Sequence, residues 1–196
     1  QFATPLGAMT VDVKTCAMLV DNHELIEAST APHRNEHALE VQLPFLQSVA
    51  PKASLVPIVC GEMDLREIRD VAALLSRHLW RDDTIWTISS DFTHFGRSFG
   101  YTPFDTDVPK RLEELDRGAI KHILDQDSAG FLDYVSRTGA TICGRLPIAI
   151  LLAVLEHRRN EEEISCHLID YTTSGRLSRD YSHSVSYASI AVTVKR

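Results

Sequence analysis

Residues 84–96 read TIWTISSDFTHFG, and this stretch decides the fold that we expect. Its first half, through Ile88, is β-branched and apolar, which predicts a buried strand. Two serines and Asp91 follow directly, and His94 comes three residues after Asp91. In an α/β sheet, ligands and chemistry collect at the carboxyl ends of the strands. A carboxylate and an imidazole at this end favour an acid, base or ligand role; the alternative is that Asp91 caps the next turn and His94 packs on its edge.

The composition indicates an ordinary globular protein. The chain has 196 residues, of which 44% are hydrophobic and 24% are charged, and we expect a single domain over residues 1–196. The formal net charge of -7 argues against nucleic acid or an anionic membrane as the main partner. No apolar run approaches the roughly eighteen residues that a membrane-spanning helix requires.

The four cysteines are Cys16, Cys60, Cys143 and Cys166. None forms a C-x-x-C pair, and a chain of this length does not need disulfides to fold. We therefore expect reduced thiols and a cytoplasmic location.

Hydrophobic periodicity predicts strands that alternate with helices. The predicted strands are residues 53–60, 84–88, 164–171 and 184–194, and the predicted helices are residues 13–28, 36–49, 64–80, 109–124, 128–136 and 146–157. Pro44 is expected to kink or end the second helix, and Asp64 is a plausible N-cap of the third. This order favours an α/β fold, a mixed and mostly parallel sheet flanked by helices, with antiparallel strands at its end.

Cys143 lies in the segment TICGRLPI, residues 141–148. Pro147 and the leucines after it predict the first turn of a buried helix. A cysteine just ahead of a helix N-terminus and close to Arg145 favours a thiolate, which can act as a nucleophile, a redox centre or a soft-metal ligand. The alternative is a buried cysteine whose neighbouring glycine makes the turn.

A second candidate lies in the segment EHALE, residues 36–40. On a helix, His37 and Glu40 would lie on adjacent turns and face the same point, as a base and its orienting carboxylate. The alternative is an exposed pair at the start of a helix.

Several motifs occur together in a characteristic order. They are TPLG at residues 4–7, EHALEVQLPFL at 36–46, SSDFTH at 89–94, ICGRLPI at 142–148 and VSYA at 185–188. Together they resemble the Memo family, whose microbial members are also called AmmeMemoRadiSam system protein B. The resemblance covers nearly the whole chain.

The resemblance implies the fold of the class III extradiol dioxygenases and a mononuclear iron or copper site formed by two histidines and a cysteine. Cys143 matches the cysteine ligand, and His94 matches the acid–base histidine of the dioxygenases, with Asp91 beside it. His37 and Glu40 match positions near the pocket.

The chain departs from the family pattern in one respect. The family's two histidine ligands lie in an N-terminal segment with a His-Ala-Gly motif and a later Pro-x-His, and neither motif occurs here. We therefore expect that this segment is absent, and that the missing segment or a protein partner completes the sheet.

Three functions follow from these residues. The first is a metal-dependent oxidoreductase with His94 as proton carrier and Asp91 orienting it. The second is a module that binds a peptide or a small molecule in the same cleft. The third is a metal-free hydrolase or transferase in which His94 activates Cys143.

Overall fold

The computed structural model describes residues 1–195 of the chain. Its contacts form two compact units, Gln1–Ser89 and Ser90–Arg196, and we describe each unit by itself. The single domain over residues 1–196 stays a prediction. Within the described residues, no helix combines the length and the apolar character needed to cross a membrane.

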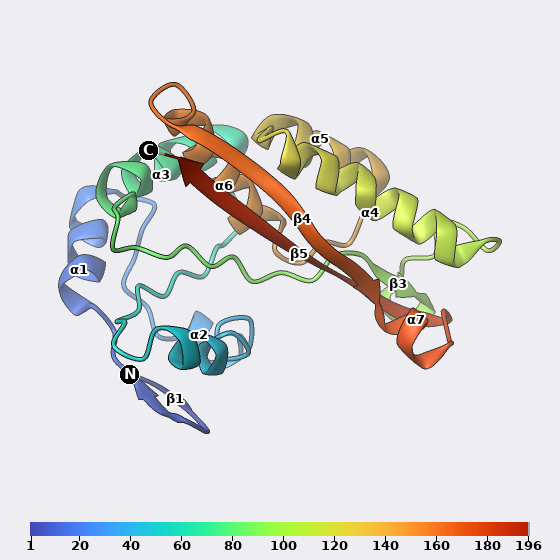
Figure 1. The fold of residues 1–196 in the computed structure, drawn as a ribbon, viewed down its shortest axis with the longest axis horizontal. Coiled ribbons are helices and arrows are strands. Elements are labelled where there is room, and N and C mark those ends of the chain that lie inside the picture. The colour runs from blue at the N-terminus through green and yellow to red at the C-terminus, as the bar shows by residue number, and fades with distance from the viewer. Residues whose placement is uncertain (196) are drawn as a thin grey trace. The chain divides into compact units, whose positions relative to one another are not determined.

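The first unit consists of a small hairpin and three α-helices (Figure 1). Its elements are β1 (Phe2–Thr4), β2 (Gly7–Met9), α1 (Val13–Asn22), a 3₁₀ helix (Pro32–Arg34), α2 (Leu43–Val49) and α3 (Leu65–Leu79). β1 and β2 pair antiparallel. Asp64 caps α3 as the sequence predicts, because its carboxylate accepts the backbone N–H of Glu67 while the Glu67 side chain accepts the N–H of Asp64.

Two helix predictions in this unit need correction. The helix predicted over residues 36–49 begins only at Leu43, and residues 38–42 form turns. Pro44 lies in the first turn of α2 and does not kink it, because proline has no N–H to lose there and its fixed φ suits the start of a helix. The helix predicted over residues 13–28 ends at Asn22, where His23 turns to extended backbone.

The second unit contains a three-stranded antiparallel sheet and a set of helices (Figure 1). Its elements are β3 (His94–Gly96), a 3₁₀ helix (Arg97–Phe99), α4 (Val108–Leu124), α5 (Ser128–Thr138), α6 (Arg145–Arg158), β4 (Glu163–Thr173), α7 (Ser174–Ser178) and β5 (His183–Lys195). The strand order is β3-β5-β4, and β4 and β5 form a long hairpin. The predicted antiparallel closing strands and the last three predicted helices are confirmed.

The mixture of helices and strands agrees with the predicted α/β class, but the parallel sheet is not confirmed. Every strand ladder in the described residues is antiparallel. The bridge between Val11 and Leu55 is parallel, but it is an isolated bridge outside the strands. Residues 53–60 and 84–88, which were expected to be strands, form no ladder. An apolar, β-branched sequence indicates burial, whereas a strand also needs a hydrogen-bonded partner that composition does not reveal.

The core of the second unit forms around α5 and α6. α5 packs against both α4 and α6, and its Phe131 is completely buried. α6 is apolar on nearly every side, so Leu152 and Val154 on different faces are both buried. The buried helix after Cys143 is therefore present as predicted, and it gives the residues ahead of it a rigid support.

Two glycines flank the 3₁₀ helix that follows β3. Gly96 has a φ of 137°, and a Cβ there would lie 2.6 Å from the carbonyl oxygen of Ser182. Gly100 has a φ of 67°, with nothing within 4 Å of such a Cβ. Gly96 therefore needs both an unusual backbone conformation and the absence of a side chain, whereas Gly100 needs only the conformation.

This difference predicts unequal costs for two matched substitutions. Gly100→Ala should lower the free energy of unfolding by about 1 kcal/mol, because alanine is strained in the left-handed region. Gly96→Ala should cost at least about 2 kcal/mol, because the strain is joined by a backbone clash. Urea unfolding followed by circular dichroism checks both values. Equal losses in the two variants would contradict the packing described for Gly96.

Candidate functional site

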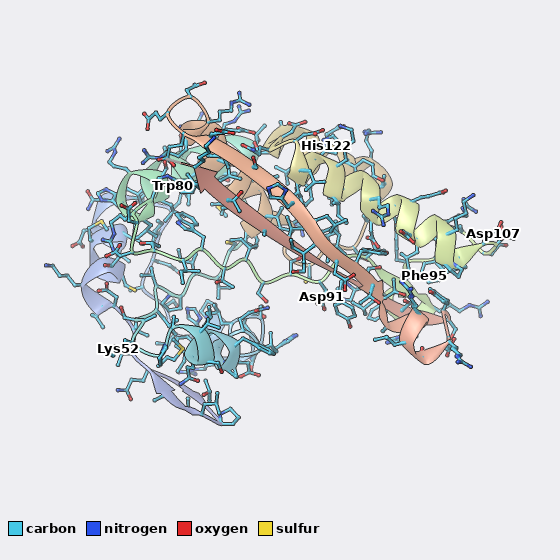
Figure 2. All side chains as sticks on the ribbon, in the orientation of Figure 1. Lys52, Trp80, Asp91, Phe95, Asp107 and His122 are labelled. Atoms are coloured by element: carbon cyan, nitrogen blue, oxygen red, sulfur yellow. The ribbon has the colours of Figure 1, made fainter. Side chains whose placement is uncertain are left out.

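Three of the residues singled out by sequence come together in the second unit. Asp91 lies just before β3, His94 is the first residue of β3, and Cys143 lies two residues ahead of α6. Figure 2 shows Asp91 and the neighbouring Phe95 near β3, at the α7 end of the β4–β5 hairpin. Direct contacts link the three residues in the order Cys143, Asp91, His94.

Cys143 is held by the backbone of the segment before β3. The Asp91 N–H donates to its Sγ at 3.2 Å, and the Ser90 hydroxyl lies 3.8 Å from the same sulfur. The Ser90 hydroxyl oxygen also accepts the Gly144 N–H at 2.9 Å. Gly144 occupies the N-cap position of α6 and has no side chain to cap the helix, so Ser90 satisfies this free donor from a distant part of the sequence. The Cys143 side chain is thereby fixed while remaining exposed.

His94 is fastened to Thr141 by three hydrogen bonds. The His94 N–H donates to the Thr141 hydroxyl oxygen at 2.8 Å, and that hydroxyl donates to the His94 carbonyl at 2.8 Å. Nδ1 of the ring lies 2.8 Å from the Thr141 carbonyl oxygen. Because a carbonyl oxygen can only accept, Nδ1 must carry a hydrogen, and Nε2 is the nitrogen that can take up or release a proton.

Nε2 of His94 faces the carboxylate of Asp91. The distance from Nε2 to Asp91 Oδ2 is 3.6 Å, which is longer than an ordinary hydrogen bond and within the range of an ion pair. The His94 side chain is 21% exposed and that of Asp91 is 42% exposed, so the pair lies at the edge of the core and is reachable from solvent. Nε2 is therefore directed at the carboxylate, and both groups remain accessible to solvent.

Aromatic rings cover one side of His94. The Phe99 ring meets the His94 ring edge-on, with 5.1 Å between centroids, and stacks on the His183 ring at 4.4 Å. His183 is in turn held by the Ser98 hydroxyl, 2.7 Å from its Nδ1. Phe99, at the end of the 3₁₀ helix that follows β3, thus supplies an apolar wall beside His94.

Tyr187 on β5 lies close enough to Asp91 for its charge to matter. Burial, and after it the negative charge of Asp91, raise the pKa of the Tyr187 hydroxyl above its usual range, so it remains a hydrogen-bond donor at neutral pH. Tyr187 is 39% exposed, so this donor is accessible to solvent.

Some of these partners could be found in the sequence and others could not. Ser90 and Thr141 stand inside the motifs that contain Asp91 and Cys143, so motif proximity was an available signal. Phe99 and His183 are 84 positions apart (183 minus 99), and no local pattern connects them.

The structure does not bring His37 and Glu40 together. Both belong to the first unit, and both precede α2 instead of lying on it. The nearest charged group to His37 is Glu36, with 4.0 Å from Nδ1 to Oε1, and the His37 side chain is 79% exposed. Within residues 1–195, no hydrogen bond or ion pair joins His37 to Glu40. The helical alignment predicted for the two residues is not found, because the helix starts only at Leu43. A binding role of His37 and Glu40 stays a prediction.

The side chains around Cys143 are of types that bind iron or copper, but there are too few of them to form a metal site. Thiolate, imidazole and carboxylate groups are all ligands of these metals. Among the described residues, however, no three His, Cys, Asp or Glu side chains lie around a common point that could hold a metal ion. These residues alone therefore do not fit a mononuclear iron or copper site.

Comparisons with known proteins place the chain in a family. A family model described as "Memo-like protein" matches residues 1–191. The chain is 30% identical over 197 residues to "Protein memo-1 homolog" of Caenorhabditis elegans, a match covering 96% of this chain and 56% of that protein. It is 33% identical over 197 residues to a MEMO1 family protein of Thermococcus kodakarensis, with 95% of this chain and 66% of that protein covered.

The similarity extends to a human relative. Protein MEMO1 of Homo sapiens is 28% identical over 201 residues, covering 98% of this chain and 68% of that protein. The chain thus spans 56% to 68% of the length of these three relatives. On the match over residues 1–191, the chain belongs to the Memo-like protein family.

Proposed function

We propose that this chain carries the acid–base and thiol part of a metal-dependent oxidoreductase site. The observation that supports the proposal most directly is the hydrogen bond between His94 Nδ1 and the Thr141 carbonyl. It leaves Nε2 free for proton transfer and directs this nitrogen toward Asp91. In the proposal His94 carries the proton, and Asp91 orients the ring and stabilises its charged form.

Cys143 has a separate role in this proposal. Its thiolate would be one ligand of iron or copper, and a bound metal would supply Lewis-acid or redox chemistry. Tight transition-metal sites usually have three or more protein ligands. Because residues 1–195 contain no such group, the remaining ligands would come from other polypeptide.

A fold like that of the class III extradiol dioxygenases belongs to the same proposal. The family membership supports it, and so does the position of His94 and Asp91 in the SSDFTH motif. We also propose a cytoplasmic location, which is supported by four cysteines that are all free in the described residues.

One observation favours a second function, the binding of a peptide or small molecule. Cys143 and Asp91 are accessible, and the exposed Tyr187, close enough to Asp91 to be affected by its charge, adds a hydroxyl donor. Polar groups next to an aromatic wall, here the Phe99 and His183 rings, are typical of sites that orient a ligand. Such a module would use the same residues without turnover.

A metal-free Cys–His mechanism has less support. The partners of Cys143 Sγ are Ser90 and the backbone of Asp91, whereas the His94 ring bonds to Thr141 and faces the Asp91 carboxylate. A histidine that activates a thiol would be expected within hydrogen-bond reach of the sulfur.

The oxidoreductase proposal is tested on the natural protein, isolated from its source without a metal-binding tag. We expect iron or copper in that protein and oxygen consumption with ascorbate as the reductant. Cys143→Ser should lose the metal, because a hydroxyl is a harder and less acidic ligand than a thiolate. His94→Gln should keep the metal and consume oxygen about 100-fold more slowly, the size of a typical acid–base contribution.

Two further comparisons complete this test. His157→Gln changes an exposed histidine on α6 and should leave the metal content and the oxygen consumption unaltered. Residues 1–196 on their own should hold far less than one iron or copper per chain. A tightly bound stoichiometric metal in residues 1–196 would contradict the ligand assignment, and a metal-free natural protein would favour the binding module.

Alkylation of the cysteines tests the third function. Cys143 is exposed, whereas burial raises the pKa of the Cys60 thiol to about 11. At neutral pH, iodoacetamide should modify Cys143 at least about tenfold faster than Cys60. The Cys60 rate should rise about tenfold per pH unit until the pH reaches that pKa, because only the thiolate reacts.

The decisive comparison is His94→Gln, with labelling followed by peptide mass spectrometry. The hydrogen bonds of Cys143 predict an unchanged Cys143 rate in this variant, as in the His157→Gln control. A marked fall in the His94 variant alone would support a thiol activated by that histidine.

A further inference from the structure

Asp116 is a buried carboxyl group that the proposed chemistry does not use. It lies within α4, and its exposed fraction is 0%. A buried carboxyl needs hydrogen-bond donors, and Asp116 has one for each oxygen. Oδ1 accepts the backbone N–H of Thr93 at 3.2 Å, and Oδ2 accepts the Tyr171 hydroxyl at 2.7 Å. Residues from α4, β4 and the segment before β3 therefore meet at this group.

The donor Thr93 lies between the two residues of the acid–base pair. The segment Phe92–Thr93 separates Asp91 from His94, and both of its residues are buried. The Phe92 N–H donates to the Ser186 carbonyl at 2.9 Å, and the Ser186 N–H donates to the Thr93 carbonyl at 3.0 Å. Neither of these two bonds uses the Thr93 N–H, which donates to Asp116 instead.

We propose that Asp116 is a positioning residue for the Asp91–His94 pair. It fixes the Thr93 N–H and thereby the backbone from which both side chains project. The inference rests on the proposed function, since positioning matters only if Asp91 and His94 act together. Nε2 of His94 and Oδ2 of Asp91 are 3.6 Å apart, so a small backbone shift would change the distance and the alignment of the two side chains.

The hydrogen bonds predict which substitutions preserve this role. Asparagine keeps an oxygen for the Thr93 N–H, and its NH₂ group can donate to the Tyr171 oxygen. The Tyr171 hydroxyl, 3.3 Å from Ser186 Oγ, can then donate to that serine. Alanine leaves the buried Thr93 N–H without its partner, which a folded protein relieves by a local shift of the backbone.

The test compares Asp116→Asn and Asp116→Ala in residues 1–196 by NMR. One readout is the pair of ring ¹⁵N shifts of His94, assigned with His94→Gln, and the other is the exchange rate of the Thr93 amide. We expect wild-type values for Asp116→Asn. In Asp116→Ala, the Thr93 amide should exchange about tenfold faster, and the His94 shifts should lose the pattern of an Nδ1–H ring.

A matched control separates positioning from general destabilisation. Phe131→Leu on α5 removes volume from the core and should lower Tm without changing the His94 shifts. If Asp116→Ala does not fold, Asp116→Ser takes its place, because its side chain is too short to reach both donors.

Two results would overturn the inference. The first is that the His94 ring shifts and the exchange rate of the Thr93 amide keep their wild-type values in the alanine or serine variant. The second is that Phe131→Leu changes both readouts as much as the Asp116 variant does. Failure of the proposed function is a different result: His94→Gln would leave oxygen consumption intact while the Asp116 variants still altered the His94 shifts.

Discussion

The candidate site depends on the pairing of two short segments, residues 90–94 and 141–144. Hydrogen bonds join Ser90 to Gly144, the Asp91 N–H to Cys143 Sγ, and His94 to Thr141 three times. One segment enters β3 and the other enters α6, so each is supported by a regular element behind it. The hydrogen bonds that join the two segments also hold the Cys143 thiol in place and determine which nitrogen of the His94 ring faces Asp91.

The pairing of the two segments gives His94 and Cys143 different surroundings. The His94 ring bonds to the Thr141 carbonyl, and Cys143 Sγ accepts the Asp91 N–H. The imidazole and the thiol therefore have separate hydrogen-bond partners. The Phe99 ring packs against His94, while the Asp91 carboxylate that faces Nε2 is 42% exposed. This division agrees with the function that we propose, in which His94 would carry a proton and Cys143 would be one ligand of a metal.

Two local signals, a polar strand end and a helix start, single out Asp91, His94 and Cys143 in the sequence. Thr141 and Ser90 lie in the same motifs, but their roles depend on which segments become neighbours. The contact of Phe99 with His183 and the burial of Asp116 arise from the packing of distant elements, which local periodicity does not encode. The parallel sheet was not found for a related reason: residues 84–88 have the composition of a strand, while pairing requires a partner.

Neutron diffraction from deuterated crystals tests the central claim most directly, because it locates the hydrogens on the His94 ring. The account predicts a deuteron on Nδ1, bonded to the Thr141 carbonyl, at every pH at which the fold is intact. Any further deuteron on the ring should lie on Nε2, the nitrogen that faces Asp91. A neutral ring with its only deuteron on Nε2 would contradict the account, because the nitrogen assigned to proton transfer would then be a permanent donor.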